Sequence, residues 1–152
     1  MTPTATPKPL TLIPFPEQSI PLAWKWLLEF PHCNFDDYGP KTEQEFIAQM
    51  TERMENELIV GVTPIGEERQ LVGIMAYLPL TPRLGSFHGI CFARAVHGTG
   101  LPLQAMRQFI ADLFGRGKIE KIAASYFADN QRVRAFLKKL GAEDEVVVHG
   151  LR

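Results

Sequence analysis

The sequence has only two cysteines, and they show no pattern that would hold a metal ion or build a disulfide framework. Cys33 and Cys91 lie 58 positions apart, and neither belongs to a CxxC pair or to the Cys and His spacing of zinc ligands. Small domains that depend on disulfides carry many more cysteines than this chain. We therefore expect two reduced thiols and no metal site.

An excess of charge of one sign is also missing. The chain carries 16 Lys and Arg residues against 17 Asp and Glu residues, which gives a formal net charge of -1 at pH 7. Proteins that bind nucleic acid usually present a basic surface that neutralises the phosphates. The charge balance therefore argues against nucleic acid as the main partner.

Long hydrophobic runs are absent as well. No segment approaches the roughly 20 apolar residues of a membrane-spanning helix, and the first 18 residues contain no apolar core of a signal peptide. We expect no membrane contact and a cytoplasmic location. Thr and Pro dominate residues 1–9, which we expect to form a flexible leader before a single domain at residues 10–152.

Apolar periodicity and turn residues predict a series of helices and strands along the rest of the chain. Thr42 and Glu45 form a T-x-x-E capping box that opens one helix, and Asn130 and Gly141 mark the two ends of the last. Helices are expected at residues 19–30, 42–57, 101–114 and 130–140. Strands are expected at residues 10–15, 58–62, 70–78, 86–93, 119–127 and 145–151.

Two of these helices carry specific expectations about the core. Trp24 and Trp26 are two positions apart and cannot share one helix face, so only one of them is expected to be buried. The buried stripe expected on the third helix consists of Leu103, Met106, Ile110 and Leu113.

Residues 96–106, VHGTGLPLQAM, join the strand at 86–93 to the third helix through two glycines. The start of a helix carries unpaired N–H groups and partial positive charge, so such a turn can bind phosphate. Glycines before a helix also occur as plain turn chemistry, and the motif alone does not decide between the two. The sequence fits neither the GxxxxGK[ST] P-loop nor a Rossmann fingerprint early in a βαβ unit.

The order of elements is more specific than the turn. A strand, two helices, three strands, a glycine turn, a helix, a strand and a helix that begins with Asn resemble the GNAT acyltransferase superfamily over nearly the whole chain from Leu10. The resemblance implies an α/β (α+β) fold, in which a central mixed, mostly antiparallel sheet is flanked by about four helices. It also implies acetyl-CoA (coenzyme A) as the cofactor.

Two motifs carry this resemblance. GNAT proteins usually have a (Q/R)-x-x-G-x-(G/A) turn whose amides hold the pyrophosphate, and residues 97–102, HGTGLP, occupy its six places. About 30 residues further on, residues 130–142, NQRVRAFLKKLGA, resemble the family's N-x-R-A-x-x-x-Y-x-x-x-G-F segment. The coenzyme contacts that the two motifs imply are His97, Gly98, Thr99, Gly100, Leu101 and Asn130.

The last helix also carries a basic face that could reach the coenzyme's phosphates, although such a face is often only solvated surface. We assign Arg134 from this face to coenzyme binding. Its basic residues are Arg132, Arg134, Lys138 and Lys139.

The chain departs from the family's motifs at two functional places. Pro102 replaces a small residue and removes one N–H donor, and Leu137 stands where many members carry a tyrosine acid. Two functions therefore stay open. One is an acyl-CoA-dependent N-acyltransferase, in the simplest case an acetyltransferase, that acts on an amine of a small molecule or a protein. The other is a catalytically inactive GNAT-like binding or structural protein, as known among short virus-encoded relatives.

Acyl transfer to an amine needs a base for the amine and a proton donor for the leaving thiolate. The segment 86–94 has no carboxylate, and His88 lies near the family's acidic position, so His88 is the candidate base. Tyr126, on the strand after the third helix, is the candidate acid. A hydrogen-bonded structural histidine and a half-buried aromatic are the alternatives. Strand alternation places Cys91 opposite His88, and we expect it in the core.

The loop at residues 31–39, PHCNFDDYG, corresponds to the region where GNAT proteins often shape the acceptor pocket. Asp36 and Asp37 could attract a cationic amine beside Tyr38, although a polar turn with Asp caps explains the same residues. GNAT proteins usually end in two strands, whereas one is expected here, at residues 145–151. The open edge predicts that a second copy completes the sheet in a homodimer.

Overall fold

The computed structural model describes residues 9–29, 39–65, 70–125 and 130–143. The helices within these ranges are α1 (Ile20–Glu29), α2 (Glu43–Arg53), α3 (Leu101–Gly115) and α4 (Gln131–Lys139). The strands are β1 (Leu10–Pro14), β2 (Leu58–Pro64), β3 (Gly73–Pro79), β4 (Leu84–Phe92) and β5 (Lys121–Ala123). Short 3-10 helices, η1 (Glu17–Ser19) and η3 (Arg94–Val96), precede α1 and the glycine turn.

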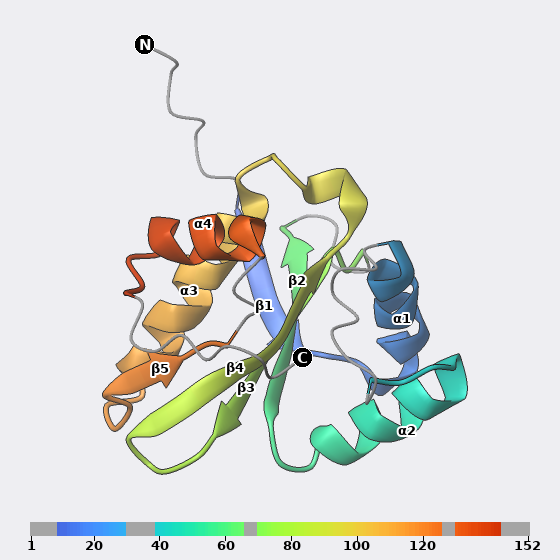
Figure 1. Ribbon diagram of the computed structural model, residues 1–152, viewed down its shortest axis with the longest axis horizontal. Coiled ribbons are helices and arrows are strands. Elements are labelled where there is room, and N and C mark those ends of the chain that lie inside the picture. Colours follow the sequence, from blue (N-terminus) through green and yellow to red (C-terminus); the bar gives the residue numbers. More distant parts are fainter. Residues whose placement is uncertain (1–8, 30–38, 66–69, 126–129, 144–152) are drawn as a thin grey trace.

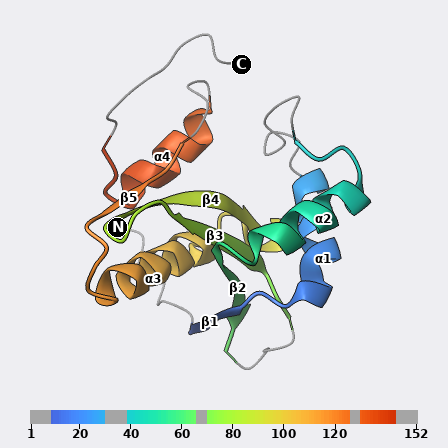
Figure 2. The same ribbon diagram turned by 90° about the horizontal axis from the view of Figure 1, so that it is seen from below.

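The strands form one sheet in the order β1-β2-β3-β4-β5. β1 to β4 pair antiparallel with their neighbours, and β5 joins the edge of β4 in parallel. Helices α3 and α4 lie on one side of the sheet, and α1 and α2 lie on the other (Figures 1 and 2). This arrangement confirms the expected α/β (α+β) class with a mixed, mostly antiparallel sheet and four flanking helices.

Each face of the sheet buries its own apolar cluster. On one face, Met106 and Phe109 of α3 pack with Met75 of β3. On the other face, Trp24 of α1 and Phe46 of α2 pack together, with ring centroids 5.3 Å apart. Burial of apolar surface on both faces is the main stabilising contribution to such a three-layer arrangement.

Two expectations about the core are wrong. Trp24 and Trp26 are both buried, because α1 packs against α2 as well as against β4 and therefore has more than one covered face. On α3, Leu103 and Ile110 are only partly buried, whereas Phe109 is fully buried. The buried stripe of α3 is therefore rotated from the predicted one and consists of Leu101, Ala105, Met106, Phe109 and Leu113.

The predicted helix starts are confirmed at Thr42 and Asn130. Thr42 Oγ1 accepts a hydrogen bond from the Glu45 N–H at 3.2 Å, and Asn130 Oδ1 accepts one from the Val133 N–H at 3.2 Å. Each bond satisfies an N–H group that has no partner inside its helix. Gly141, with φ 89°, follows α4 as the sequence predicts.

A β-bulge interrupts β4. The register against β3 shifts between Met75 and Tyr77, so that Ala76 stands opposite two residues, His88 and Gly89. Gly89 has φ 142°, a backbone conformation that residues with a side chain rarely adopt.

The bulge changes the direction of the side chains around it. Cys91 is buried in the cluster beneath α1 and α2, and the His88 ring reaches Glu57, which follows α2. Both side chains therefore point to the same side of the sheet, and the expectation that they lie on opposite faces is wrong. The extra residue shifts the alternation of side chains by one position. Cys91, three residues after His88, therefore faces the same side of the sheet as His88.

None of the helices in the described ranges is long and apolar enough to cross a membrane. The expected last strand, at residues 145–151, lies outside those ranges. Completion of the sheet edge by a second copy therefore stays a prediction.

Candidate functional site

The glycine turn connects η3 to α3, and two of its glycines have a left-handed backbone. Gly98 has φ 77°, and Gly100, the N-cap of α3, has φ 82°. A Cβ atom on either residue would meet no atom within 4 Å. Backbone conformation rather than crowding therefore requires glycine here, and the space beside both residues is open to a ligand.

The glycine turn and the first turn of α3 together offer unused backbone donors. The Leu101 N–H donates to Thr99 Oγ1 at 3.3 Å, and Pro102 has no N–H to offer. Unpaired N–H groups at a helix start, together with the helix dipole, form a site that attracts anions. Within the part of the chain that the structure describes, the N–H groups without a hydrogen bond at this turn are those of Gly98, Gly100 and Leu103.

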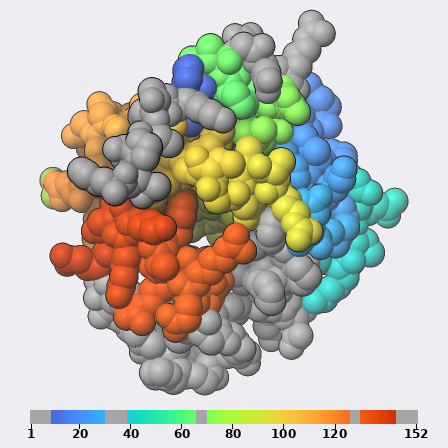
Figure 3. All heavy atoms as spheres, turned by 90° about the horizontal axis from the view of Figure 1, so that it is seen from above, coloured from blue at the N-terminus to red at the C-terminus, as the bar shows by residue number. Residues whose placement is uncertain are grey.

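His97 holds the turn against two other elements. An Arg132 guanidinium nitrogen lies 3.0 Å from His97 Nδ1, and His97 Nε2 lies 3.0 Å from the Phe92 carbonyl oxygen. A guanidinium only donates, so Nδ1 accepts, and Nε2 carries the hydrogen that it donates to Phe92. Figure 3 shows the turn, in yellow, beside α4, in red. Both ring nitrogens of His97 are thus engaged within the protein.

The start of α4 and an open strand edge lie next to this turn in the fold. β5 pairs with β4 only over residues 84–86, so residues 87–92 of β4 have no strand on that side among the described residues. Asn130 caps α4, and its side chain bonds to the helix itself. Arg134 is half-buried on α4, and Arg132 contacts the turn through His97.

His88 belongs to a second polar cluster, at the bulge of β4. Its Nδ1 lies 2.9 Å from Glu57 Oε1, and its side chain is 53% exposed, whereas that of Glu57 is 3% exposed. Arg53 donates to both oxygens of Glu57, from Nε to Oε2 at 2.6 Å and from Nη2 to Oε1 at 3.0 Å. Arg53 also donates to the backbone carbonyl of His88. The cluster therefore ties the end of α2 to β4.

The neighbours of Glu57 favour its ionised form. Burial acts to raise the pKa of Glu57, but the hydrogen bonds and positive charges of Arg53 and His88 outweigh it, so the pKa lies below the usual 4.5. An ionised carboxylate only accepts hydrogen bonds, so His88 Nδ1 carries the hydrogen of their shared bond. In the neutral ring the lone pair then lies on Nε2, the nitrogen that does not face Glu57.

Sequence reasoning missed Glu57 and Arg53. They are an i, i+4 pair at the end of a helix, and most such pairs are exposed and contribute little. Only the fold shows that this one is covered by β4, 31 residues away from Glu57. The one signal in the sequence is a basic residue, Arg53, four positions before an acidic residue, Glu57, which directly precedes an apolar strand.

Several predicted site residues lie outside the described ranges: Tyr126, Asp36, Asp37 and Tyr38. Leu137, at the place of the family's tyrosine, is half-buried on α4. No group of three or more His, Cys, Asp or Glu side chains in the described residues is arranged to hold a metal ion.

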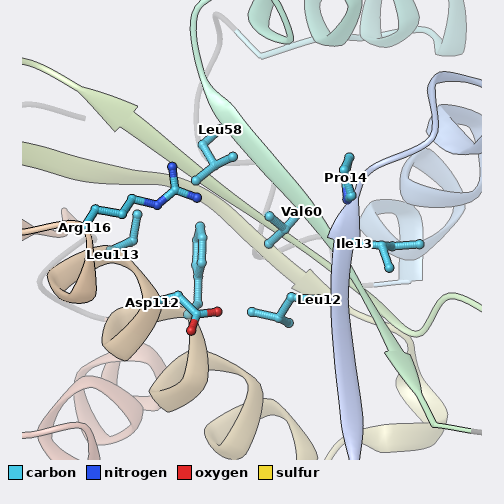
Figure 4. A pocket seen from close by; sticks show the side chains of 9 residues that line it. Leu12, Ile13, Pro14, Leu58, Val60, Asp112, Leu113 and Arg116 are labelled. Carbon is cyan, nitrogen blue, oxygen red and sulfur yellow. The ribbon is translucent and has the colours of Figure 1, made fainter.

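A pocket in the described residues lies elsewhere, between the C-terminal half of α3 and strands β1 and β2 (Figure 4). Apolar side chains such as Leu12 and Val60 line it, and Asp112 and Arg116 lie at its edge. At 1.5 Å per residue, Leu113 is about 20 Å along α3 from the glycine turn. This pocket and the two polar sites are therefore separate features.

Comparison with known proteins identifies the domain. The family described as acetyltransferase (GNAT) domain matches residues 10–143. A sequence comparison with curated proteins gives no match.

Three solved structures share the fold. A mutant of the spermidine N-acetyltransferase SpeG from Vibrio cholerae is 15% identical, with a TM-score of 0.73 over 90% of this chain and 81% of that one. RimL, a ribosomal alpha-N-protein acetyltransferase in complex with coenzyme A, is 15% identical, with a TM-score of 0.69 over 86% and 78%. An acetyltransferase from Trypanosoma brucei is 15% identical, with a TM-score of 0.66 over 94% and 99%.

Proposed function

The chain belongs to the acetyltransferase (GNAT) domain family, and on that premise we propose that it is an acyl-CoA-dependent N-acyltransferase. Acetyl-CoA is the donor, and an amine of a small molecule or a protein is the acceptor. The names of two structural neighbours span both acceptor classes, spermidine for one and a protein α-amine for the other. A third line of support is the neighbour solved with coenzyme A.

The glycine turn is the observation that carries this proposal. Among the described residues, the N–H groups of Gly98 and Gly100 have no partner and lie beside open space, at the positive end of α3. These amides hold the pyrophosphate, and Thr99 and Leu101 line the turn beside it. His97 contributes by fixing the turn, and Asn130 and Arg134 approach the coenzyme from α4.

His88 is the proposed base. Its exposed Nε2 accepts a proton from the acceptor amine as the amine nitrogen attacks the thioester carbonyl carbon. The carbon–sulfur bond breaks, the amide forms, and the coenzyme leaves as a thiolate that takes up a proton from Tyr126. The thioester supplies the reactive acetyl group, and the protein supplies binding, orientation and proton transfer.

Asp36, Asp37 and Tyr38 form the proposed acceptor contact. Two carboxylates attract an ammonium group, and an aromatic ring beside them favours a cation. Replacing both Asp36 and Asp37 by Asn should raise the KM for a cationic amine and leave the affinity for acetyl-CoA unchanged.

Thiol release from acetyl-CoA tests this function. The full chain is incubated with acetyl-CoA and with spermidine or a peptide that has a free α-amine, and the free thiol and the acetylated product are both measured. Equal amounts of thiol and acetylated amine support the N-acyltransferase. If acetyl-CoA binds but no amine is acetylated across a broad acceptor panel, the catalytically inactive binding protein becomes the better account.

A further inference from the structure

We infer that Glu57 is a positioning residue for His88: its buried carboxylate holds the imidazole so that Nε2 is exposed and able to accept a proton. Arg53 completes the cluster by holding Glu57. The inference deepens the proposed function, because it explains how an exposed histidine on a strand without carboxylates can serve as the base.

The contacts of Glu57 leave it little freedom. Its carboxylate is 3% exposed and receives two hydrogen bonds from Arg53 and one from His88. The third nitrogen of the Arg53 guanidinium, Nη1, is also engaged, since it lies 3.4 Å from Met50 Sδ. A carboxylate fixed on one side by a guanidinium can orient a ring on its other side.

Glu57 suits both protonation states of His88. With the neutral ring, it accepts the hydrogen of Nδ1 and leaves the Nε2 lone pair at the surface. When Nε2 takes a proton, the same carboxylate lies 2.9 Å from the new cation and stabilises it. A carboxylate that orients a catalytic histidine and stabilises its charged form serves the same purpose in hydrolase triads.

The backbone of His88 is fixed by the same cluster. Arg53 donates to the His88 carbonyl, and it lies over the next residue, where a Cβ on Gly89 would be 3.4 Å from Arg53 Nη2. Both the ring and the main chain of His88 are therefore held from the end of α2. Glu57 and Arg53 touch no reacting atom, so their effect on turnover passes through His88.

A purely structural role would tie α2 to β4 without setting the state of the ring. Nitrogen-15 NMR of the imidazole rings in the full chain without coenzyme separates the two roles, because it reports which nitrogen carries the hydrogen. The His88 signals are those that disappear in His88→Asn. His97 is an internal reference of opposite tautomer, since its Nε2 carries the hydrogen.

The expected result is a neutral His88 with hydrogen on Nδ1 in the wild type and mainly on Nε2 in Glu57→Leu. Because Glu57→Leu leaves Arg53 unpaired, the double variant Arg53→Met with Glu57→Leu replaces the whole ion pair by apolar side chains of similar size. It should show the same change of tautomer. The matched control Glu55→Leu, at an exposed position two residues away, should keep the wild-type spectrum.

Turnover gives the second readout. With acetyl-CoA and an accepted amine, kcat should fall about 10- to 100-fold in both Glu57 variants, a part of the 10²–10⁴ that a general base contributes. The KM for acetyl-CoA should not change. An unchanged His88 tautomer in the folded variants, or an unchanged kcat in an active enzyme, would overturn the inference. A wild type that acetylates nothing would refute the proposed function, while the tautomers would still decide what Glu57 does.

Discussion

His88, on β4, and His97, directly after η3, have the same side chain and different surroundings. His97 uses both ring nitrogens inside the protein, to Phe92 and Arg132, and so fixes the glycine turn. His88 uses Nδ1, to Glu57, and its side chain is about half exposed. Neighbouring groups, rather than residue type, therefore distinguish the two histidines, and under the proposed function they separate one that fixes the binding turn from one able to accept protons.

The two surroundings also differ in how they are assembled. The glycine turn is a continuous segment of backbone whose donors come from residues next to one another. The Arg53–Glu57–His88 cluster is made of side chains from two distant segments and depends on a bulge in β4. We therefore expect substitutions in the turn to act on coenzyme affinity and substitutions in the cluster to act on turnover.

Gly100→Val should have the largest effect, a loss of coenzyme binding of at least about 100-fold. A β-branched residue cannot adopt φ 82° without strain, and its side chain would fill the open space beside the amides. Calorimetry with coenzyme A measures this loss. Gly117→Val is the matched control, because Gly117 has φ 85° and equally open surroundings at the other end of α3. Loss of binding in both variants would mean that strain alone explains the result.

His88→Asn should lower kcat by about 100-fold or more and leave the affinity for acetyl-CoA unchanged. The Asn amide can still donate a hydrogen bond towards Glu57, so the cluster keeps a partner while the base is lost. Steady-state kinetics and calorimetry on the same sample provide the test. Wild-type turnover in this variant would remove His88 from the mechanism and favour transfer through water.

His97→Leu should show the opposite pattern. Leu fills a similar volume but loses the hydrogen bonds to Phe92 and Arg132, so the turn is held less firmly. We expect coenzyme affinity to fall about tenfold. The kcat at saturating acetyl-CoA should change by no more than about threefold. A fall in kcat as large as that of His88→Asn would erase the contrast between the two histidines.

Asn130→Ala should cost about 1 kcal/mol in the free energy of unfolding, because it removes the cap on the Val133 N–H. Chemical denaturation measures that cost, and coenzyme titration shows whether the residue also contacts the ligand. Asn130→Ser, which retains a capping oxygen, should restore most of the stability. Wild-type affinity in Asn130→Ala would limit the residue to its capping role.

The smallest expected effect is the dependence of stability on acid. The folded pKa of Glu57 lies below its unfolded value, so its stabilising contribution is present above about pH 4.5 and is lost as the pH falls below that value. The free energy of unfolding of the wild type should therefore fall more steeply with acid than that of Glu57→Gln. Glu55→Gln should follow the wild-type curve. Parallel curves for wild type and Glu57→Gln would contradict the lowered pKa of Glu57.

Local patterns allowed much of this fold to be predicted. The Thr42 and Asn130 caps, the glycines of the turn and the order of elements depend on neighbouring residues, and each takes the expected place. The burial of both Trp24 and Trp26 is not predicted, because tertiary packing, which a helical pattern does not contain, covers a second face of α1.

The side-chain cluster around His88 could be predicted only in part. The sequence proposes His88 as a base from its place on the strand before the turn, but it does not predict the hydrogen bond to Glu57, since nothing in the sequence links residues 31 positions apart. The bulge at Gly89 misled the alternation argument for Cys91, because one inserted residue reverses every later side chain. Contacts between distant segments, and irregularities within a strand, are what the pattern of one sequence leaves out.

Calorimetric titration of the full chain with acetyl-CoA is the most direct test of the central claim, that the glycine turn binds the phosphates of an acyl donor. The account predicts saturable heat at one site per chain and a raised melting temperature. It also predicts that sodium chloride weakens the binding, since the ligand is an anion held by partial charges. Absence of both heat and thermal shift at millimolar acetyl-CoA would contradict the claim.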